Sequence, residues 1–281
     1  MKPQYQHNVA TSFALWFDHH LLSEGEAFSN QTGKFYNYED PRISTAYKVF
    51  GSSHKQFVFD SSVSGAIIPS GVFVNSVFKP RSSALVMDYV NGRVLTTGVA
   101  ATANVTGAYS VKDFSIYMSN EDEEDLIIEN NFEENLKFTR SGTYIQPYDE
   151  IIPAVFIVSD SIKNKPFSFG GEDETRSNMK CVVFTDNPYD LDGVLSLFAD
   201  TQKKVFTEKD FGDYPLTEYG DLKSYPYNYS DYYANPNPSV ELFIDDVTVS
   251  KLKDTRSRSS NVKTYIGFID FEITQYRYPR A

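Results

Sequence analysis

The chain has 281 residues, of which 41% are hydrophobic and 15% aromatic, and this content excludes a wholly disordered protein. Its formal net charge of −12 argues against tight binding to nucleic acid or to an anionic membrane, because both need clustered Lys and Arg. The 22 Phe and 20 Tyr stand against a single Trp, and because Phe and Tyr favour strands, the composition indicates a β-rich fold.

The first predicted element is a helix over residues 8–24, where apolar side chains recur at spacings of three and four. Asn8 is suited to cap its start, and Gly25 stands where a helix would stop. Trp16 lies on the apolar face, so we expect it to anchor the helix on a sheet or on a neighbouring subunit.

A long loop with room for one short strand is predicted over residues 30–53, and a series of strands follows it. Asn91-Gly92 is the strongest local signal, because this pair is typical of a type I′ turn between two antiparallel strands. Two further pairs of segments are expected, one broken at Pro69-Ser70-Gly71 and one joined near residue 110. The predicted strands are residues 56–60, 66–68, 72–78, 84–90, 93–97, 104–109 and 113–118.

The second half combines strands with one longer helix. Residues 120–129 are predicted to form a short helix or an acidic turn, and residues 188–205 a helix capped by Asp186 or Asn187. Residues 211–239 hold seven tyrosines between Tyr214 and Tyr233 and read as a long irregular segment. The predicted strands are residues 137–139, 154–158, 178–185, 240–252 and 262–278, the last two forming a terminal hairpin with a bulge or two-sided burial near residues 267–270.

These elements predict an α+β fold, β-rich, with antiparallel hairpins. We expect either two domains, residues 1–145 and 146–281, or one. No apolar run is long enough for a membrane-spanning helix, and residues 1–9 do not resemble a secretory signal, so we expect assembly in a cytoplasm.

Motifs for catalysis are weak. His19 and His20 are adjacent on the predicted helix and diverge by about 100°, so they are not expected to share a metal ion. Cys181 lies in an apolar stretch and reads as a buried small side chain, and its being the only cysteine excludes a disulfide within the chain. Asp245-Asp246 is weak support for a glycosidase in a chain with 38 acidic residues. We therefore predict no enzyme, no cofactor and no metal.

Three surface features remain as candidates. An acidic block is either a solvated face or a surface that repels DNA or pairs with a basic neighbour: Glu121, Asp122, Glu123, Glu124 and Asp125. The polar tip of the terminal hairpin carries Arg256 and Arg258, and is either a solvated turn or a contact with an acidic face of another subunit. The tyrosine-rich segment, with Tyr227, Tyr229 and Tyr232, is an interface, a surface that stacks on sugars, or a loop resting on its own domain.

Several stretches between residues 8 and 204 resemble virion structural proteins of tailed bacteriophages, especially those of marine and cyanobacterial phages. The similar stretches begin at Asp60, Pro69, Met87, Tyr109, Pro166 and Phe184, and the stretch from Met87 contains Asp88-Tyr-Val-Asn-Gly-Arg-Val94. Residues 211–281 carry no such resemblance.

The resemblance implies a neck or tail-terminator subunit at the head–tail junction. Its expected partners are further copies of itself in a ring, a portal-side adaptor, and a tail tube or sheath. Genome DNA would pass through the ring without specific binding, and the acidic block would line the lumen. A baseplate component that binds host glycans is the alternative, and a glycan-cleaving enzyme is a third possibility, which would need a close carboxylate pair in a cleft.

Overall fold

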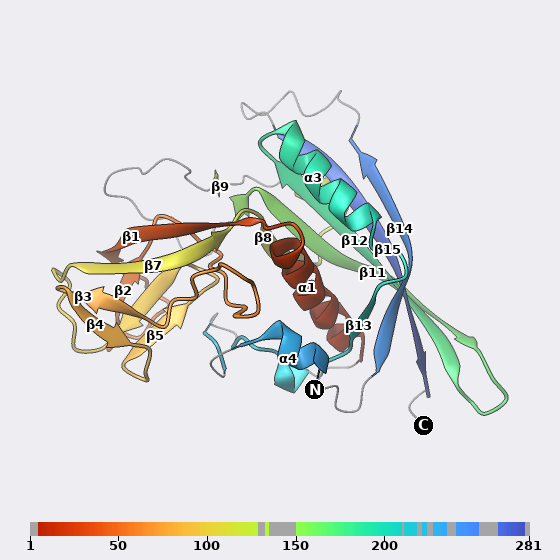
Figure 1. Cartoon of the computed structure of the whole chain (residues 1–281), viewed down its shortest axis with the longest axis horizontal. Coiled ribbons are helices and arrows are strands. Elements are labelled where there is room, and N and C mark those ends of the chain that lie inside the picture. The colour runs from red at the N-terminus through yellow and green to blue at the C-terminus, as the bar shows by residue number, and fades with distance from the viewer. Residues whose placement is uncertain are drawn as a thin grey trace.

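Two β-sheets and a long helix between them make up the computed structural model, which describes residues 5–128, 133–134, 150–209, 211–217, 221–223, 227–234, 240–252 and 264–278 (Figure 1). The first sheet has the strand order β4-β3-β7-β1-β2-β6-β5, and the second has the order β13-β14-β15-β12-β11-β8. The predicted α+β, β-rich fold with antiparallel hairpins is confirmed.

The first sheet is built around strand β1, which pairs with β7 on one side and β2 on the other. The loop predicted over residues 30–53 is therefore wrong. Strand β7 pairs with residues 28–35 and strand β2 with residues 36–38, so each residue of β1 has a strand neighbour, and its polar and half-exposed side chains do not prevent strand formation. Its strands are β1 (Phe28–Tyr38), β2 (Lys48–Gly51), β3 (Gly71–Val74), β4 (Val77–Pro80), β5 (Leu85–Asp88), β6 (Arg93–Thr96) and β7 (Val105–Lys112).

The predicted hairpin around Asn91-Gly92 is confirmed, but its two-residue turn is wrong. The last pair is Asp88 with Arg93, so four residues form the loop, and only Gly92 has a positive φ of 61°. The Asp88 carboxylate accepts a hydrogen bond from the Asn91 backbone amide at 3.0 Å, which holds this longer loop. Two consecutive positive φ angles, the mark of a type I′ turn, occur instead at Asn75 and Ser76 between β3 and β4.

Strands β7 and β8 (Ser115–Ser119) follow one another in the chain but do not pair, contrary to prediction. Strand β7 lies in the first sheet, whereas β8 runs parallel to β11 in the second. Residues 56–60 contribute only the isolated bridge of Phe57 with Val111, and residues 66–68 form no strand.

Both faces of the second sheet are covered. Helices α1 (Tyr5–Ser23) and α3 (Pro188–Ala199) lie on one face, and Leu126 of helix α2 (Glu123–Ile128) packs on the other. The two-sided burial predicted for the last strand is confirmed, because Ile266 and Phe271 enter different cores. The register irregularity falls at Ile244/Asp246 of the partner strand. The strands are β11 (Ala154–Pro166), β12 (Asp173–Thr185), β13 (Val205–Thr207), β14 (Glu241–Lys251) and β15 (Tyr265–Arg277).

The helix ends follow local chemistry in part. The side chain of Asn187 caps α3 by accepting from the Asp190 backbone amide at 2.8 Å, as predicted, but α3 ends at Ala199 rather than at residue 205. Helix α1 starts before Asn8, so Asn8 does not cap it. The remaining elements are the parallel pair β9 (Glu133–Glu134) and β10 (Ile151–Ile152), a 3-10 turn (Phe211–Asp213) and α4 (Tyr229–Ala234).

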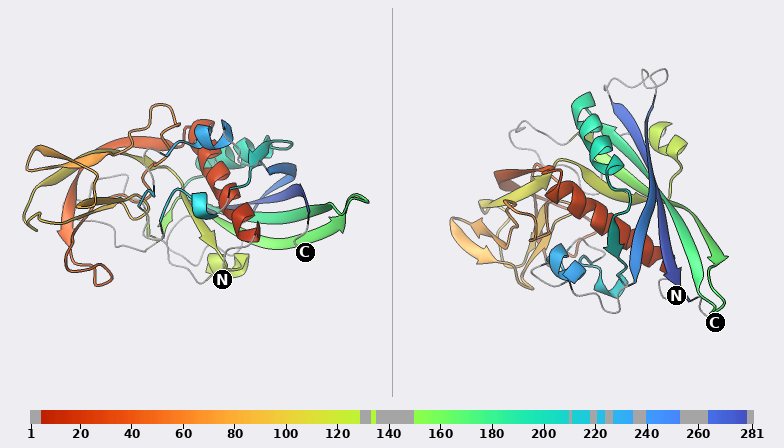
Figure 2. Two further views of the ribbon diagram at one scale, coloured as in Figure 1. Left: turned by 90° about the horizontal axis from the view of Figure 1, so that it is seen from below. Right: turned by 45° about the vertical axis from the view of Figure 1, so that its right-hand side comes forward.

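The first half of the chain also contributes to the second sheet's layer, through α1 and β8 (Figure 2). One buried cluster contains side chains of both sheets and of α1. The division at residues 145/146 and the strand predicted over residues 137–139 fall outside the described residues, and the two-domain division stays a prediction.

Candidate functional site

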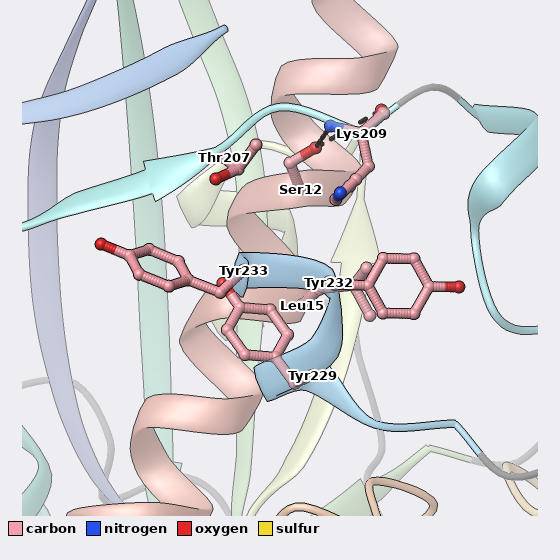
Figure 3. A pocket seen from close by; sticks show the side chains of 7 residues that line it. All are labelled: Ser12, Leu15, Thr207, Lys209, Tyr229, Tyr232 and Tyr233. Carbon is pink, nitrogen blue, oxygen red and sulfur yellow. Dashed lines mark hydrogen bonds between the residues drawn. The ribbon is translucent and has the colours of Figure 1, made fainter. Parts of the chain in front are cut away.

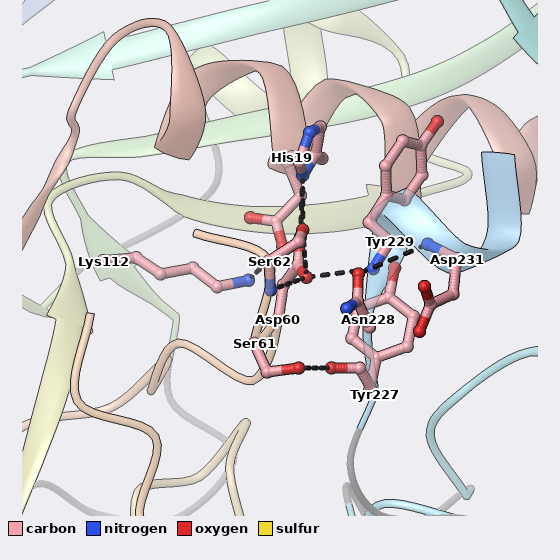
Figure 4. A network of polar contacts seen from close by, with 10 residues as sticks. His19, Asp60, Ser61, Ser62, Lys112, Tyr227, Asn228, Tyr229 and Asp231 are labelled. Atoms are coloured by element: carbon pink, nitrogen blue, oxygen red, sulfur yellow. Dashed lines mark hydrogen bonds and ion pairs between the residues drawn. The ribbon is translucent and has the colours of Figure 1, made fainter. Parts of the chain in front are cut away.

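The most elaborate polar arrangement lies where α1 meets the turn after Phe59 and the segment around α4 (Figure 4). Asp60, 1% exposed, is its centre. One carboxylate oxygen accepts from the backbone amides of Ser62 at 2.9 Å and Tyr229 at 3.0 Å, and from the Ser62 hydroxyl at 2.7 Å. The other lies 2.7 Å from His19 Nδ1. We call this set of contacts the Asp60 junction.

The electrostatics of the junction favour a charged Asp60. Burial alone would raise the Asp60 pKa, but the hydrogen bonds from His19, Ser62 and Tyr229 outweigh it and hold this pKa below its usual value. A charged, fully hydrogen-bonded carboxylate is costly to separate from its donors, so the junction fastens the segment around α4 onto α1.

The junction contains Ser, His and Asp but does not have the geometry of a catalytic triad. In a triad the two imidazole nitrogens contact different partners, the nucleophile and the acid. Here the Ser62 hydroxyl at 3.4 Å and Asp60 at 2.7 Å both face His19 Nδ1. The hydroxyl of Ser62 donates to Asp60, and the His19 ring stacks on Tyr229 with centroids 4.3 Å apart. This arrangement positions chain segments and does not activate Ser62.

A buried ion pair lies beside the junction and ties α1 to the first sheet. Lys112 Nζ of β7 is 2.8 Å from Asp18 Oδ2 of α1 and also lies over the Phe59 ring, 4.5 Å from its centroid. Burial raises the Asp18 pKa, while Lys112 opposes that shift. The second Asp18 oxygen is buried without a hydrogen-bond partner among the described residues.

Two tyrosines of the tyrosine-rich segment, Tyr227 and Tyr229, face inward, whereas Tyr233 is exposed. Tyr227 and Tyr229 are 3% and 9% exposed, and burial raises the pKa of both phenols. Tyr232 is half-buried and donates its hydroxyl to the Asp213 carbonyl at 2.9 Å. The cavity that Tyr229, Tyr232 and Tyr233 line with Ser12 has a volume of about 10 Å³, space for one water molecule at most (Figure 3). Tyr227 and Tyr229 thus rest on their own fold, and the interface alternative for the segment stays a prediction.

Trp16 also packs inside the chain. Its ring stacks on Phe206 of β13 at 5.4 Å and on His20 at 5.4 Å, and it meets Phe271 of β15 edge-on at 6.2 Å. Of its two expected anchors, a sheet or a neighbouring subunit, Trp16 uses the sheet. Trp16, Tyr227 and Tyr229 are buried within the chain, and their role in an intermolecular contact stays a prediction.

The acidic block is at the start of α2, on the face of the second sheet opposite α1. Glu121, Asp122, Glu124 and Asp125 are exposed, whereas Glu123 is half-buried and lies 3.4 Å from Lys180. A negative, solvated surface is thus present at this face, as the lumen hypothesis needs. Arg256 and Arg258 lie outside the described residues.

A groove lies between the end of α1 and helix α3, with a volume of about 620 Å³. Its lining includes Leu21, Leu197 and Phe114 as an apolar floor and the exposed Tyr189 at its edge. The carboxylates along it are Glu24, Glu26, Asp113, Asp190 and Asp200, and no Lys or Arg lines it. The groove therefore disfavours an anionic ligand. No sequence signal indicated this site, because its residues come from three separate segments.

The β3–β4 hairpin and the β11–β12 hairpin lie at opposite ends of the long axis of the molecule (Figure 1), and each carries large exposed apolar side chains. At the β3–β4 end these are Phe73, Val77 and Phe78, with Val77 63% exposed. At the β11–β12 end they are Phe167, Phe169, Tyr276 and Tyr278, and Phe169 is fully exposed. Clustered exposed apolar groups mark surfaces that contact other molecules. Sequence patterns missed both clusters, because a hairpin tip has the same alternation whether it is covered or free.

No family model and no curated protein matches this chain. Within the described residues, no three His, Cys, Asp or Glu side chains come close enough together to hold a metal ion. None of the helices in that part of the chain has both the length and the hydropathy needed to cross a bilayer.

Proposed function

We propose that the protein is a structural subunit of a tailed-phage virion at the head–tail junction, a neck or tail-terminator-like subunit that assembles as a ring around the DNA path. The observation that carries the proposal is the pair of uncovered apolar clusters at opposite ends of the long axis. A subunit with different contact surfaces at its two ends is suited to head-to-tail association, which closes into a ring when the rotation per copy allows it.

Other features support the same role. The buried ionic and tyrosine contacts hold the fold together and give the subunit a rigid body for assembly. The exposed carboxylates of Glu121, Asp122, Glu124 and Asp125 would give the lumen a surface that repels DNA and lets it slide. Assembly would take place in the bacterial cytoplasm, beside a portal-side adaptor and a tail tube or sheath.

The test is the mass of the purified protein in solution, measured by light scattering, together with negative-stain images of the same sample. We expect a closed ring of several copies with a central hole. Neutralising the acidic block, with E121Q, D122N, E124Q and D125N together, should leave the ring intact and make it retain DNA. A protein that stays a monomer at its highest soluble concentration, alone and with phage neck proteins, would contradict the proposal.

A baseplate component that binds host glycans is the second candidate, and the groove beside α3 is the observation that favours it. Carboxylates and an exposed aromatic ring such as Tyr189 are the groups that hydrogen-bond and stack on sugars. Binding of the monomer on a glycan array, lost in Tyr189→Ala, would establish this function in place of the ring.

A further inference from the structure

The second sheet has two stretches of unpaired strand edge, one on the outer side of β14 and one on the outer side of β11. Strand β13 pairs with Glu241–Phe243 of β14, and backbone hydrogen bonds of Lys203 and Lys204 extend this cover to Ile244. Beyond the bulge at Asp245 no described residue pairs with the outer side of residues 246–251. On the far side of the sheet, β8 covers only Ala154–Val158 of β11, and residues 159–166 have no described neighbour on their outer side. We call these two stretches the β14 free edge and the β11 free edge.

The directions of the two strands match. Strand β11 is antiparallel to β12, β12 to β15, and β15 to β14, so β11 and β14 run in opposite directions. A β11 strand placed beside the β14 of another copy would therefore continue an antiparallel sheet. Because the two free edges lie at opposite ends of the sheet (Figures 1 and 2), the same chain cannot join them, but successive copies can.

The backbone groups that face outward can be identified. The Leu252 amide donates to Ile266 of β15, and the Phe167 amide donates to Glu172 across the β11–β12 turn. Since successive residues of a strand point to opposite sides, Val247, Val249 and Lys251 face outward from the β14 free edge. By the same alternation, Ile162 and Asn164 face outward from the β11 free edge.

Side chains select a register between the two edges. When Val249 is set opposite Ile162, Asp246 comes opposite Lys165. Val249 pairs with Ile269, and Ile162 with Ser177 and through it with Ile273, so both side chains lie on the face of the sheet that carries α1 and α3. The register thus joins one apolar pair on that face and one ion pair on the other.

Charge favours the pairing of unlike edges. The β11 free edge carries Asp160, Lys163 and Lys165, and the β14 free edge carries Asp246 and Lys251. In this register Asp246 comes opposite Lys165, and opposite charges across a strand pair are stabilising. Two β11 edges would instead bring lysines of the two copies together, which is destabilising. Charge does not act against two β14 edges, because antiparallel pairing would set Asp246 of one copy near Lys251 of the other.

We propose that the β11 free edge of one copy adds to the β14 free edge of a second copy, antiparallel and with Val249 opposite Ile162. The partner is thus another copy of this chain, recognised by main-chain hydrogen bonds and by cross-strand pairing. This inference rests on the proposed ring function, for which it supplies a contact between subunits. The contact is heterologous, so each copy keeps one edge free for the next.

A cysteine pair tests the contact and its register together. In the proposed register Thr248 lies opposite Lys163 at a position that exchanges no hydrogen bonds, where Cβ atoms approach to about 4.5–5.5 Å, near the reach of a disulfide. The double variant Thr248→Cys with Lys163→Cys should give a ladder of cross-linked oligomers under mild oxidation. Each single variant should lose the ladder, and the native Cys181 is buried and does not interfere.

A shifted pair is the matched control. Thr248→Cys with Ser161→Cys moves the register by two residues and should give no ladder. A ladder of equal strength from the shifted pair, or none from either pair, would overturn the contact. As a second readout, Asp246→Lys should weaken self-association by up to about five-fold, and adding Lys165→Asp should restore it.

The outcomes separate this contact from the ring function. A ring whose copies do not cross-link through residues 163 and 248 would overturn the edge contact and leave the proposed virion role standing. Open filaments that cross-link in the proposed register would support the edge contact and count against the closed ring.

Discussion

The Asp60 junction and the β11–β12 end of the second sheet are both rich in aromatic side chains, yet the surroundings of those rings differ. We call the latter, with Phe167, Phe169, Tyr276 and Tyr278, the projecting end. At the junction Tyr227 and Tyr229 are buried beside the Asp60 carboxylate, and both of its oxygens have hydrogen-bond partners. At the projecting end Phe169 is fully exposed, and strand edges there lack described neighbours. The difference teaches that aromatic density alone does not locate an intermolecular surface. The proposed contacts rest instead on unpaired backbone and uncovered apolar area.

The largest loss of stability is expected from Arg93→Ala, which removes a buried cation. Arg93 is buried in the first sheet, 2.6 Å from both Asp40 and Asp88. Removing it leaves two buried carboxylates without their cation, so we expect the free energy of unfolding to fall by about 3–5 kcal/mol. Urea unfolding measures this. Arg176→Ala, which breaks half-exposed ion pairs with Glu174 and Glu272, is the control and should change stability much less. Equal losses in both variants would refute the account.

A second test of the buried region is the dependence of its stability on pH, for which His20 is the relevant group. Burial, with a smaller effect of Lys204, lowers the pKa of His20 from 6.5 to about 4. The folded state therefore resists protonation more than the unfolded chain, so this stability is fully present above pH 6.5 and is lost as the pH falls towards about 4. The loss is on the order of 3 kcal/mol.

The variant His20→Phe keeps a ring against Trp16 and should remove this part of the acid sensitivity. Unfolding measured at pH 7 and at pH 4.5 compares the variant with the natural protein, and the exposed His7→Gln is the control. An unchanged difference between the two pH values in His20→Phe would show that another group causes it.

The junction itself can be opened with Asp60→Ala. The Tyr229 amide and the groups of Ser62 then lose their acceptor, which we expect to cost about 2 kcal/mol. Hydrogen exchange should rise most in residues 227–234. Asp231→Ala, on the exposed side of α4, should leave exchange unchanged. Protection of residues 227–234 that survives in Asp60→Ala would mean that the tyrosine contacts alone hold the segment.

The smallest effect on stability is expected at the projecting end. Phe169→Ser should leave the melting temperature unchanged, because the side chain is fully exposed. It should still weaken self-association, measured by sedimentation, if this end contacts another molecule. A lower melting temperature with unchanged association would place Phe169 among the folding contacts instead.

Local patterns predicted the elements whose cause is local. The apolar spacing of α1, the hairpin around Asn91-Gly92, the Asn187 cap of α3 and the long terminal hairpin all follow from neighbouring residues. Strand β1 was missed, because its polar residues are held by strands distant in sequence. The junction was missed for a related reason. Asp60 and Tyr229 are 169 residues apart, and the sequence around either residue gives no sign of a contact with the other.

Hydrogen exchange at low and at high protein concentration tests most directly which surface is intermolecular. The account predicts that residues 159–166 and 246–251 become protected as copies associate, while residues 227–234 are equally protected at both concentrations. Protection that appears in residues 227–234 on association, with the two free edges unchanged, would contradict it.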